Sequence, residues 1–264
     1  MIKSLHISAE TLSTVKRASW IGLLFFAAFL VISAVERKEA SLASELSIGI
    51  EPLPDGQLLI DDQDVRQAIE RSFGYRLEGL PIGSIDVERL EKALEEEPLI
   101  LDADVYIAAN NRIKVGIVQR QPILRIMDNN GLNYYLDANG IKMPLSAHFA
   151  AKVIVATGNL PPHESQFLNR KRNTLKDAFL LTKLIREDEF LNALIEQIHV
   201  SNRGEITLVP KVGNHKIIFG KFDSAAKKLQ RLKIFYKEAL PYEGWNKYSE
   251  ISLQYDGQVV CKKR

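Results

Sequence analysis

The most apolar stretch of the chain lies near its N-terminus, at residues 18–35. These residues carry no charge, and charged side chains stand directly before them, at Lys16 and Arg17, and directly after them, at Glu36 and Arg37. A helix of this length rises roughly 27 Å, which nearly spans a hydrocarbon core of about 30 Å. A buried core helix would usually show a polar stripe, and a cleavable signal peptide would need a small-x-small site directly after the apolar run. The pattern therefore favours a retained transmembrane helix.

The flanks of this helix favour a cytoplasmic N-terminus. The tail at residues 1–17 carries three basic residues against the single acidic Glu10, and cytoplasmic segments of membrane proteins carry an excess of Lys and Arg. Residues 36–45 are charged and small, and they are expected to form a linker, with continuation of the helix for a turn or two as an alternative for its first residues. We therefore expect the remainder of the chain to be exported.

Alternating apolar and polar positions next predict a small α+β region at residues 46–121. Period-two alternation at 46–50, 103–107 and 113–117 predicts three strands, and residues 58–60 are expected to extend the first of them. Apolar residues at helical spacing, from Val65 to Phe73 and from Ile85 to Leu94, predict two helices. The expected order is strand, helix, helix, strand, strand.

From Pro122 onward the pattern changes to short strands separated by turn residues such as Asn, Asp and Gly. Amphipathic helices are predicted at 174–186 and 224–239, and residues 159–173 are expected to be an exposed loop. The longest alternating strand is predicted at 248–255, followed by a turn at Asp256 and Gly257 and a return strand at 258–261. These features predict a mixed, mainly antiparallel β domain with flanking helices at 122–264, and an α+β fold for the chain after its transmembrane helix.

Composition narrows the possible functions. The formal net charge is +2 over 264 residues, so no global field favours nucleic acid or an acidic partner. Cys261 is the single cysteine, which excludes a disulfide framework. We interpret it as a small apolar residue in a terminal strand.

Motifs that would indicate catalysis, a cofactor or a metal are missing from the sequence. The five histidines show no HExxH spacing, and the acidic run from Asp61 to Asp64 lacks the glycine and distal glutamate of a calcium loop. We interpret that run as a helix N-terminus, and the basic run from Arg170 to Arg172 as a solvated surface. The chain is therefore expected to be a binding or scaffold protein with no cofactor, no metal and no small-molecule substrate.

The strand predicted at 248–255 offers two interpretations. If it lies at the edge of a sheet, its free amides and carbonyls can pair with a strand from a partner. If it is internal, it is already paired on both sides. The pattern alone does not distinguish these alternatives.

Several motifs, in this order, resemble the bacterial cell-division family FtsQ/DivIB. The strand from Ile113 that runs into the Arg120-Gln-Pro122 step resembles the junction between two domains of that family. Residues 134–140, Tyr-Tyr-Leu-Asp-Ala-Asn-Gly, resemble its next hairpin. The C-terminal part of the resemblance rests on Phe219, Gly220, Lys228, Leu229, Leu232, Trp245, Tyr248, Ile251 and Leu253.

The resemblance implies a single-pass inner-membrane protein whose periplasmic part consists of a POTRA-like domain and a β domain. It implies a divisome scaffold at the septum that binds FtsB- and FtsL-type partners, with other divisome members possible, and that helps regulate septal peptidoglycan synthesis. In the family, the last long strand accepts a strand from the FtsB-type partner. This maps the binding segment to Trp245, Lys247, Tyr248, Ser249, Glu250, Ile251, Ser252, Leu253, Gln254 and Tyr255. Many members carry arginine where this chain has Gln254, so a charged pair at that point is in doubt.

Two other functions remain as alternatives. The first is a POTRA-containing envelope transport or assembly factor, although such chains usually repeat the domain or continue into a barrel. The second is an anchored periplasmic enzyme, for which the sequence offers no candidate nucleophile.

Overall fold

A computed structural model describes residues 9–264 of the chain. This part divides into two compact units. The first unit contains the segment ending at Gly49, together with Val65–Leu94 and Ala103–Gly116. The second unit contains Ile50–Asp64, Glu95–Asp102 and Ile117–Arg264.

The predicted transmembrane segment lies within a long helix, α1 (Ala9–Glu39), which extends beyond residues 18–35 at both ends. Its segment Ser19–Glu39 has a mean hydropathy of 2.0 and is long and apolar enough to cross a membrane. Apolar side chains such as Phe25 and Phe29 are exposed, as expected of a helix whose solvent is lipid. This single N-terminal apolar helix fits a single-pass membrane anchor. Residues 1–8 of the predicted tail lie outside the described residues.

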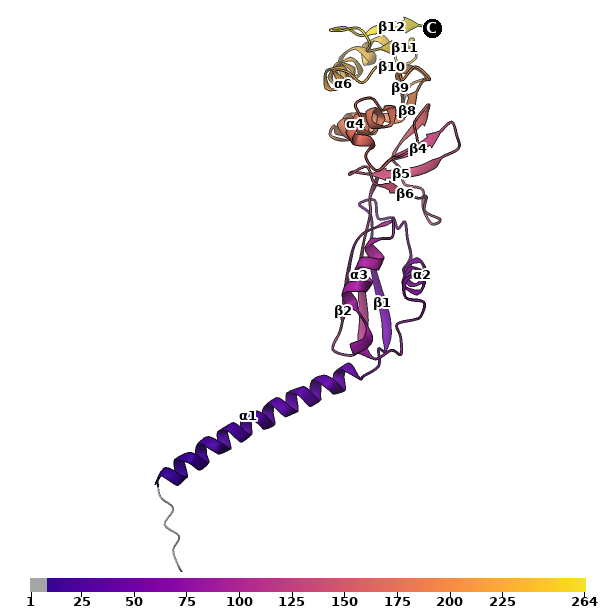
Figure 1. The fold of residues 1–264 in the computed structure, drawn as a ribbon. Helices are drawn as coiled ribbons and strands as arrows, with labels where there is room; N and C mark the ends of the chain where they lie inside the picture. Colours follow the sequence, from indigo (N-terminus) through magenta and orange to yellow (C-terminus); the bar gives the residue numbers. More distant parts are fainter. Residues whose placement is uncertain (1–8) are drawn as a thin grey trace, which may run out of the picture. The chain divides into compact units, whose positions relative to one another are not determined.

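The predicted order of strand, helix, helix, strand, strand is confirmed (Figure 1). The elements are β1 (Glu45–Glu51), α2 (Asp62–Phe73), the 3-10 turn η1 (Ile82–Ser84), α3 (Val87–Glu95), β2 (Ile100–Ile107) and β3 (Arg112–Gln119). The three strands form a sheet with the order β1-β3-β2. The region therefore has the architecture of a POTRA-like domain.

Side-chain periodicity explains the helices of this region. α2 buries Val65, Ala68 and Ile69, which share one helical face. α3 buries Leu90 and Leu94, one turn apart. Both helices are strongly amphipathic, so burial of one face can hold them in place.

Residues 58–60 do not extend β1 as predicted. The chain turns after β1, where the amide of Leu53 donates to the carbonyl of Gln57 and Gly56 adopts a positive φ of 79°. The amide of Leu59 then donates to the side-chain oxygen of Gln119 at 2.5 Å. A buried side chain thus satisfies a backbone group that a strand partner would otherwise satisfy.

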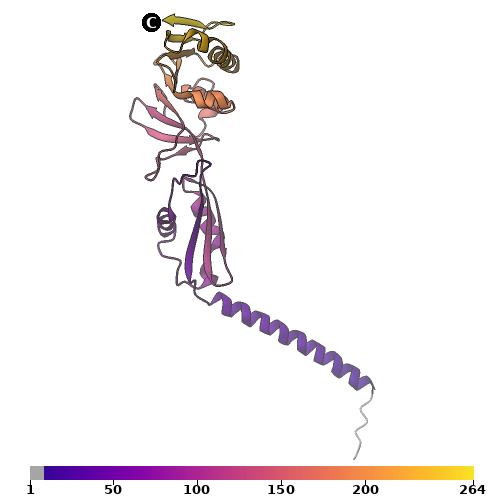
Figure 2. The same ribbon diagram turned by 180° about the vertical axis from the view of Figure 1, so that it is seen from behind.

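The second unit is built on a nine-stranded sheet with the order β12-β11-β10-β9-β8-β7-β4-β5-β6. Figure 2 shows the ribbon from behind. Three neighbouring pairs, β4 with β7, β7 with β8 and β10 with β11, are parallel, and the other five are antiparallel. The strands are β4 (Pro122–Asp128), β5 (Asn133–Asp137), β6 (Lys142–Met143), β7 (Ile154–Gly158), β8 (Ile195–Val200), β9 (Ile206–Pro210), β10 (Lys216–Gly220), β11 (Tyr248–Ser252) and β12 (Val260–Lys263). The sheet is mixed and mainly antiparallel, as predicted.

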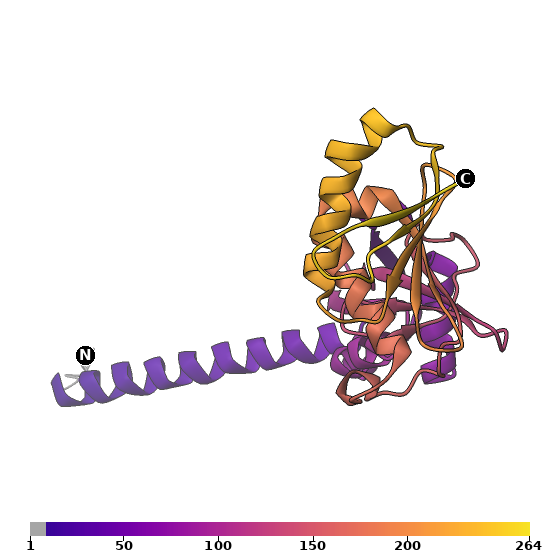
Figure 3. The ribbon, with the colours of Figure 1, turned by 90° about the horizontal axis from the view of Figure 1, so that it is seen from above.

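The main helices of this unit lie together on one side of its sheet (Figure 3). They are α4 (Thr174–Arg186), α5 (Glu189–Leu194), α6 (Ala225–Ile234), the π-helical turn η3 (Phe235–Ala239) and α7 (Leu240–Glu243). α4 begins as predicted because the side chain of Asn173 accepts a hydrogen bond from the amide of Lys176. The helix predicted at 224–239 is interrupted by the π turn, which contains the buried Tyr236.

The segment at 159–173 is less exposed than predicted. It contains the 3-10 turn η2 (Phe167–Asn169), and Leu160 and Phe167 are buried in the core between sheet and helices. The ring of Phe167 packs edge-on against that of Phe179. Two buried apolar side chains hold this loop against the core. The many polar residues around them led to the sequence-based prediction of an exposed loop.

Candidate partner-binding edge

The strand proposed from the sequence as a partner-binding edge is internal. β11 pairs in parallel with β10, with Ile217 opposite Ile251, and antiparallel with β12, with Ile251 opposite Cys261. The second of the two sequence-based alternatives is therefore correct. Strand addition to the backbone of Glu250–Ser252 is excluded while β12 is in place, because both sides of that backbone are already paired. β11 also ends at Ser252 rather than at Tyr255.

The predicted binding residues fall into three classes of exposure. Ile251 and Leu253 are completely buried in the core of the second unit. Tyr248, Ser249, Glu250 and Ser252 are half-buried. The exposed members are Trp245, Lys247, Gln254 and Tyr255. The structure brings the predicted residues together around β11, but it leaves only some of their side chains accessible.

The open edge of the sheet is β12, which lies outermost in the strand order. None of the residues that the structure describes pairs with its outer side. Charged residues follow Cys261 along the strand, at Lys262 and Lys263. Sequence reasoning missed this edge, although the turn at Asp256 and Gly257 and the short return strand were the signal that could have found it.

The hydrogen bonds of β11 show which backbone groups of β12 point outward. The amide of Leu253 donates to the carbonyl of Ile218 in β10. Successive residues of a strand alternate between neighbours, so Ile251 also faces β10, and Glu250 and Ser252 face β12. Their partners in β12 thus face inward, and the N–H and C=O of Cys261 face outward.

A buried histidine–tyrosine pair supports the segment that leads into β11. The ring nitrogen Nε2 of His215 lies 2.5 Å from the hydroxyl of Tyr236. Burial raises the pKa of Tyr236, so its hydroxyl stays protonated beside the imidazole. Burial, with the nearby charge of Arg264, lowers the pKa of His215, and the backbone of Trp245 partly offsets this. The ring of Trp245 packs on that of Tyr236 with centroids 6.0 Å apart.

Charged groups also order this segment. Lys247 forms an ion pair with Glu243, four residues earlier at the end of α7, and the hydroxyl of Tyr248 donates to the same carboxylate at 3.2 Å. The hydrogen bond from Lys247, followed by that from Tyr248, lowers the pKa of Glu243. Burial and then the charge of Glu243 raise the pKa of the Cys261 thiol. The thiol therefore stays protonated at neutral pH, in line with its interpretation as a small apolar residue.

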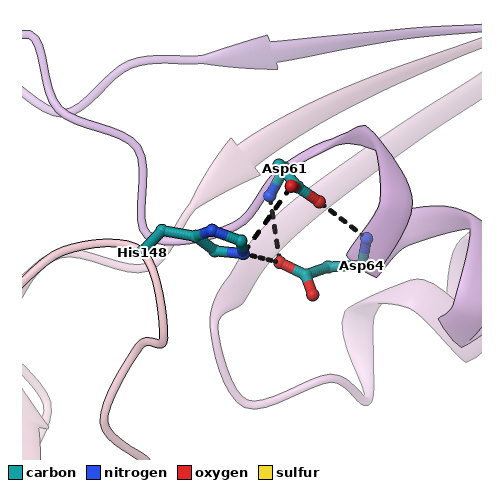
Figure 4. A group of neighbouring side chains, drawn as sticks. All are labelled: Asp61, Asp64 and His148. Carbon is teal, nitrogen blue, oxygen red and sulfur yellow. Dashed lines mark hydrogen bonds and ion pairs between the residues drawn. The ribbon is translucent and has the colours of Figure 1, made fainter.

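A second cluster of polar groups lies at the start of α2 (Figure 4). Potential ligand atoms of Asp61, Asp64 and His148 lie within 4.8 Å of one another. The amide of Asp61 donates to the carboxylate of Asp64 at 3.0 Å. In return, the amide of Asp64 donates to the carboxylate of Asp61 at 2.9 Å. Nε2 of His148 lies 2.7 Å from Asp64. Each carboxylate thus accepts a backbone amide at the helix start, and we assign the cluster to capping of the helix, as the sequence predicted.

Two models of known protein families match this chain. The model described as FtsQ/DivIB, C-terminal related, matches residues 121–262, which is more than half of the chain. The model of the POTRA-like domain matches residues 43–118. No curated protein sequence matched the chain.

Proposed function

We propose, since this chain belongs to the FtsQ/DivIB family of cell-division proteins, that it is a membrane-anchored scaffold and regulator of the divisome. It binds FtsB- and FtsL-type partners at the septum and helps control septal peptidoglycan synthesis. α1 anchors it in the inner membrane, and the residues after α1 lie in the periplasm. In this proposal residues 46–121 form the POTRA-like domain, and residues 122–264 form the β domain.

The open outer side of β12 is the observation that supports partner binding. A strand with one free side presents a row of unpaired N–H and C=O groups, and a second chain can satisfy them by adding a strand. We place strand addition on Val260–Lys263, where the backbone of Cys261 faces outward. This replaces the earlier expectation that the backbone of β11 would pair with the partner.

Side chains around β11 complete the proposed surface. Trp245 and Tyr255 are both exposed aromatic residues, at 39% and 52% of their full accessible area, and exposed aromatic residues are frequent anchors of protein interfaces. Ile251 and Leu253 act indirectly, because their burial holds β11 and thereby β12 in position. Gln254 is exposed and contributes a hydrogen-bonding group without charge.

Substitution of one edge residue tests the mode of binding. Proline at position 261 removes an outward amide, and proline is tolerated on the edges of sheets. We expect full-length Cys261→Pro, purified in detergent, to lose co-purification with an FtsB-type partner. Cys261→Ala, which keeps the amide, should retain it.

Thermal unfolding of both variants provides the control for folding. If Cys261→Pro unfolds like the wild type and still captures the partner, strand addition at β12 is wrong. A fluorescent fusion that fails to gather at the septum of dividing cells would contradict the wider proposal.

The two alternatives make different predictions. FtsQ/DivIB proteins are non-enzymatic scaffolds, and we propose the same for this chain. Turnover of cell-wall substrates by the purified protein would instead support an enzyme. Defective assembly of outer-membrane proteins, with normal septation, in cells that lack the protein would support a transport or assembly factor.

A further inference from the structure

A polar pocket of about 340 Å³ lies in the second unit, away from β12. Three cationic residues line it, namely Lys152, Arg186 and Lys211. Asn192 and Glu196 contribute further polar groups. Nothing in the proposed scaffold function uses this pocket.

The topology of the sheet brings these distant residues together. β7 and β8 are parallel, so both strands begin at the same end of the sheet. β9 is antiparallel to β8 and therefore ends there. Lys152 precedes β7, Lys211 follows β9, and Arg186 is the last residue of α4.

The three cations lack partners among the residues that the structure describes, since none of their side chains has a hydrogen bond or ion pair there. Two other cations of the second unit have partners, Lys228 with Asp223 and Lys233 with Asp188, whereas Lys152, Arg186 and Lys211 line one pocket together. Like charges that line one pocket repel one another, and water weakens this repulsion at the exposed Lys152 and Lys211 more than at the half-buried Arg186. An anion in the pocket would relieve it.

Helix electrostatics account for only part of this arrangement. Arg186 lies in the last turn of α4, where the helix dipole favours a positive charge. Lys152 and Lys211 lie outside the helices, and the dipole effect fades beyond the last turn. Glu196 offsets one of the three charges, which leaves a net charge of two.

We propose that this pocket binds a phosphate monoester group. Such a group carries a charge of about −1.5 to −2 at pH 7, which balances the lining. The guanidinium of Arg186 can donate two parallel hydrogen bonds to phosphate oxygens, and the two lysines supply point charges. The volume exceeds that of a bare phosphate and falls in the range of about 300–1,000 Å³ for small-molecule sites, so it leaves room for the ester's organic part.

Thermal unfolding of the full-length protein in detergent tests the proposal. Inorganic phosphate should raise the unfolding temperature relative to chloride at equal ionic strength, because a ligand that binds only the folded state stabilises it. The triple variant Lys152→Gln, Arg186→Gln, Lys211→Gln should lose this shift. Arg186→Gln alone should weaken phosphate binding about tenfold, the loss expected for one charge-assisted hydrogen bond.

A matched control separates the pocket from general charge. A control variant removes the same charge from exposed positions outside the pocket, through Lys171→Gln, Arg172→Gln and Lys227→Gln. It should keep the rise in unfolding temperature that phosphate causes. The proposal is wrong if the wild type shows no shift, if the pocket variant keeps it, or if the control loses it.

The source of the phosphate is tested with a second probe. Binding of glycerol phosphate that is tighter than that of inorganic phosphate supports an ester ligand. Equal or weaker binding of the ester contradicts that part of the proposal and indicates free phosphate. Since none of these variants touches β12, partner capture and phosphate binding can fail independently.

Discussion

The sheet of the second unit ends differently at β6 and at β12. β6 has only two residues, and beside it Leu53, Leu59, Tyr135 and Met143 form a small buried core. β12 has four residues, and most of its side chains are exposed. Edge strands invite pairing with other chains unless they are short or covered. The comparison indicates that the sheet is closed at β6, whereas the edge at β12 can still pair with another strand.

Buried polar contacts reinforce the closed end. The guanidinium of Arg120 forms an ion pair with Asp137 at 3.1 Å and donates to the carbonyls of Pro98 and Ile100. The other oxygen of Asp137 accepts the amides of Asn139 and Ile141. One arginine thus joins the segment at the start of β2 to the turn between β5 and β6.

The largest expected effect is that of Arg120→Ala. The side chains of Arg120 and Asp137 are 11% and 5% exposed, and removal of one partner from a buried ion pair costs about 3–5 kcal/mol. Denaturant unfolding of the full-length protein in detergent measures this loss. Arg170→Ala removes a largely exposed pair with Glu164 and should cost about 0–1 kcal/mol. Equal losses for the two variants would contradict the importance of burial at the closed end.

A pair of apolar truncations compares the two ends directly. Met143 in β6 is completely buried, whereas Val260 in β12 is 43% exposed. Met143→Ala should lower the free energy of unfolding by about 2–5 kcal/mol, and Val260→Ala should change it by about 0.5 kcal/mol or less. Denaturant titrations of both variants test this difference. A larger loss at Val260 would show that the end we describe as open is closed by packing.

The smallest expected effect is a pH dependence near the open end. Burial lowers the pKa of His215, so as pH falls the unfolded chain binds this proton before the folded chain does. Stability should be full above the ordinary pKa of about 6.5 and should decrease below it, until the folded ring also binds the proton. Carboxylates titrate mostly below this window.

Unfolding measured between about pH 7.5 and pH 5 tests this dependence. His215→Gln should show a weaker dependence of stability on pH than the wild type. An unchanged slope in His215→Gln would show that another group is responsible.

Local signals in the sequence predicted much of the fold. α4 spans the predicted residues because the N-cap at Asn173 and the periodic apolar residues agree. The turn residues Asp256 and Gly257 likewise predicted the hairpin of β11 and β12. Local signals could not predict the order of the strands in the sheet. The parallel pairing of Ile217 with Ile251, for example, joins two segments that α6 separates in the sequence. For this reason the alternation at 248–255 left open whether that strand is an edge, because alternation describes the two faces of a strand and not its neighbours. The expectation that its backbone binds a partner came from the family resemblance.

The two polar clusters depended even more on tertiary structure. His148 lies 84 residues from Asp64 in sequence, and Lys152, Arg186 and Lys211 occupy separate connections. The sequence around each of these residues indicates only an ordinary polar residue of the surface. Only the packing of the sheet and its helices brings them close.

The outward peptide groups of β12 also affect how this segment can evolve. Main-chain donors and acceptors are the same in every amino acid except proline. Side chains along β12 can therefore drift between lineages while the pattern of backbone groups persists. We expect relatives to differ widely in residue identity at this edge and to share instead an avoidance of proline at the position of Cys261.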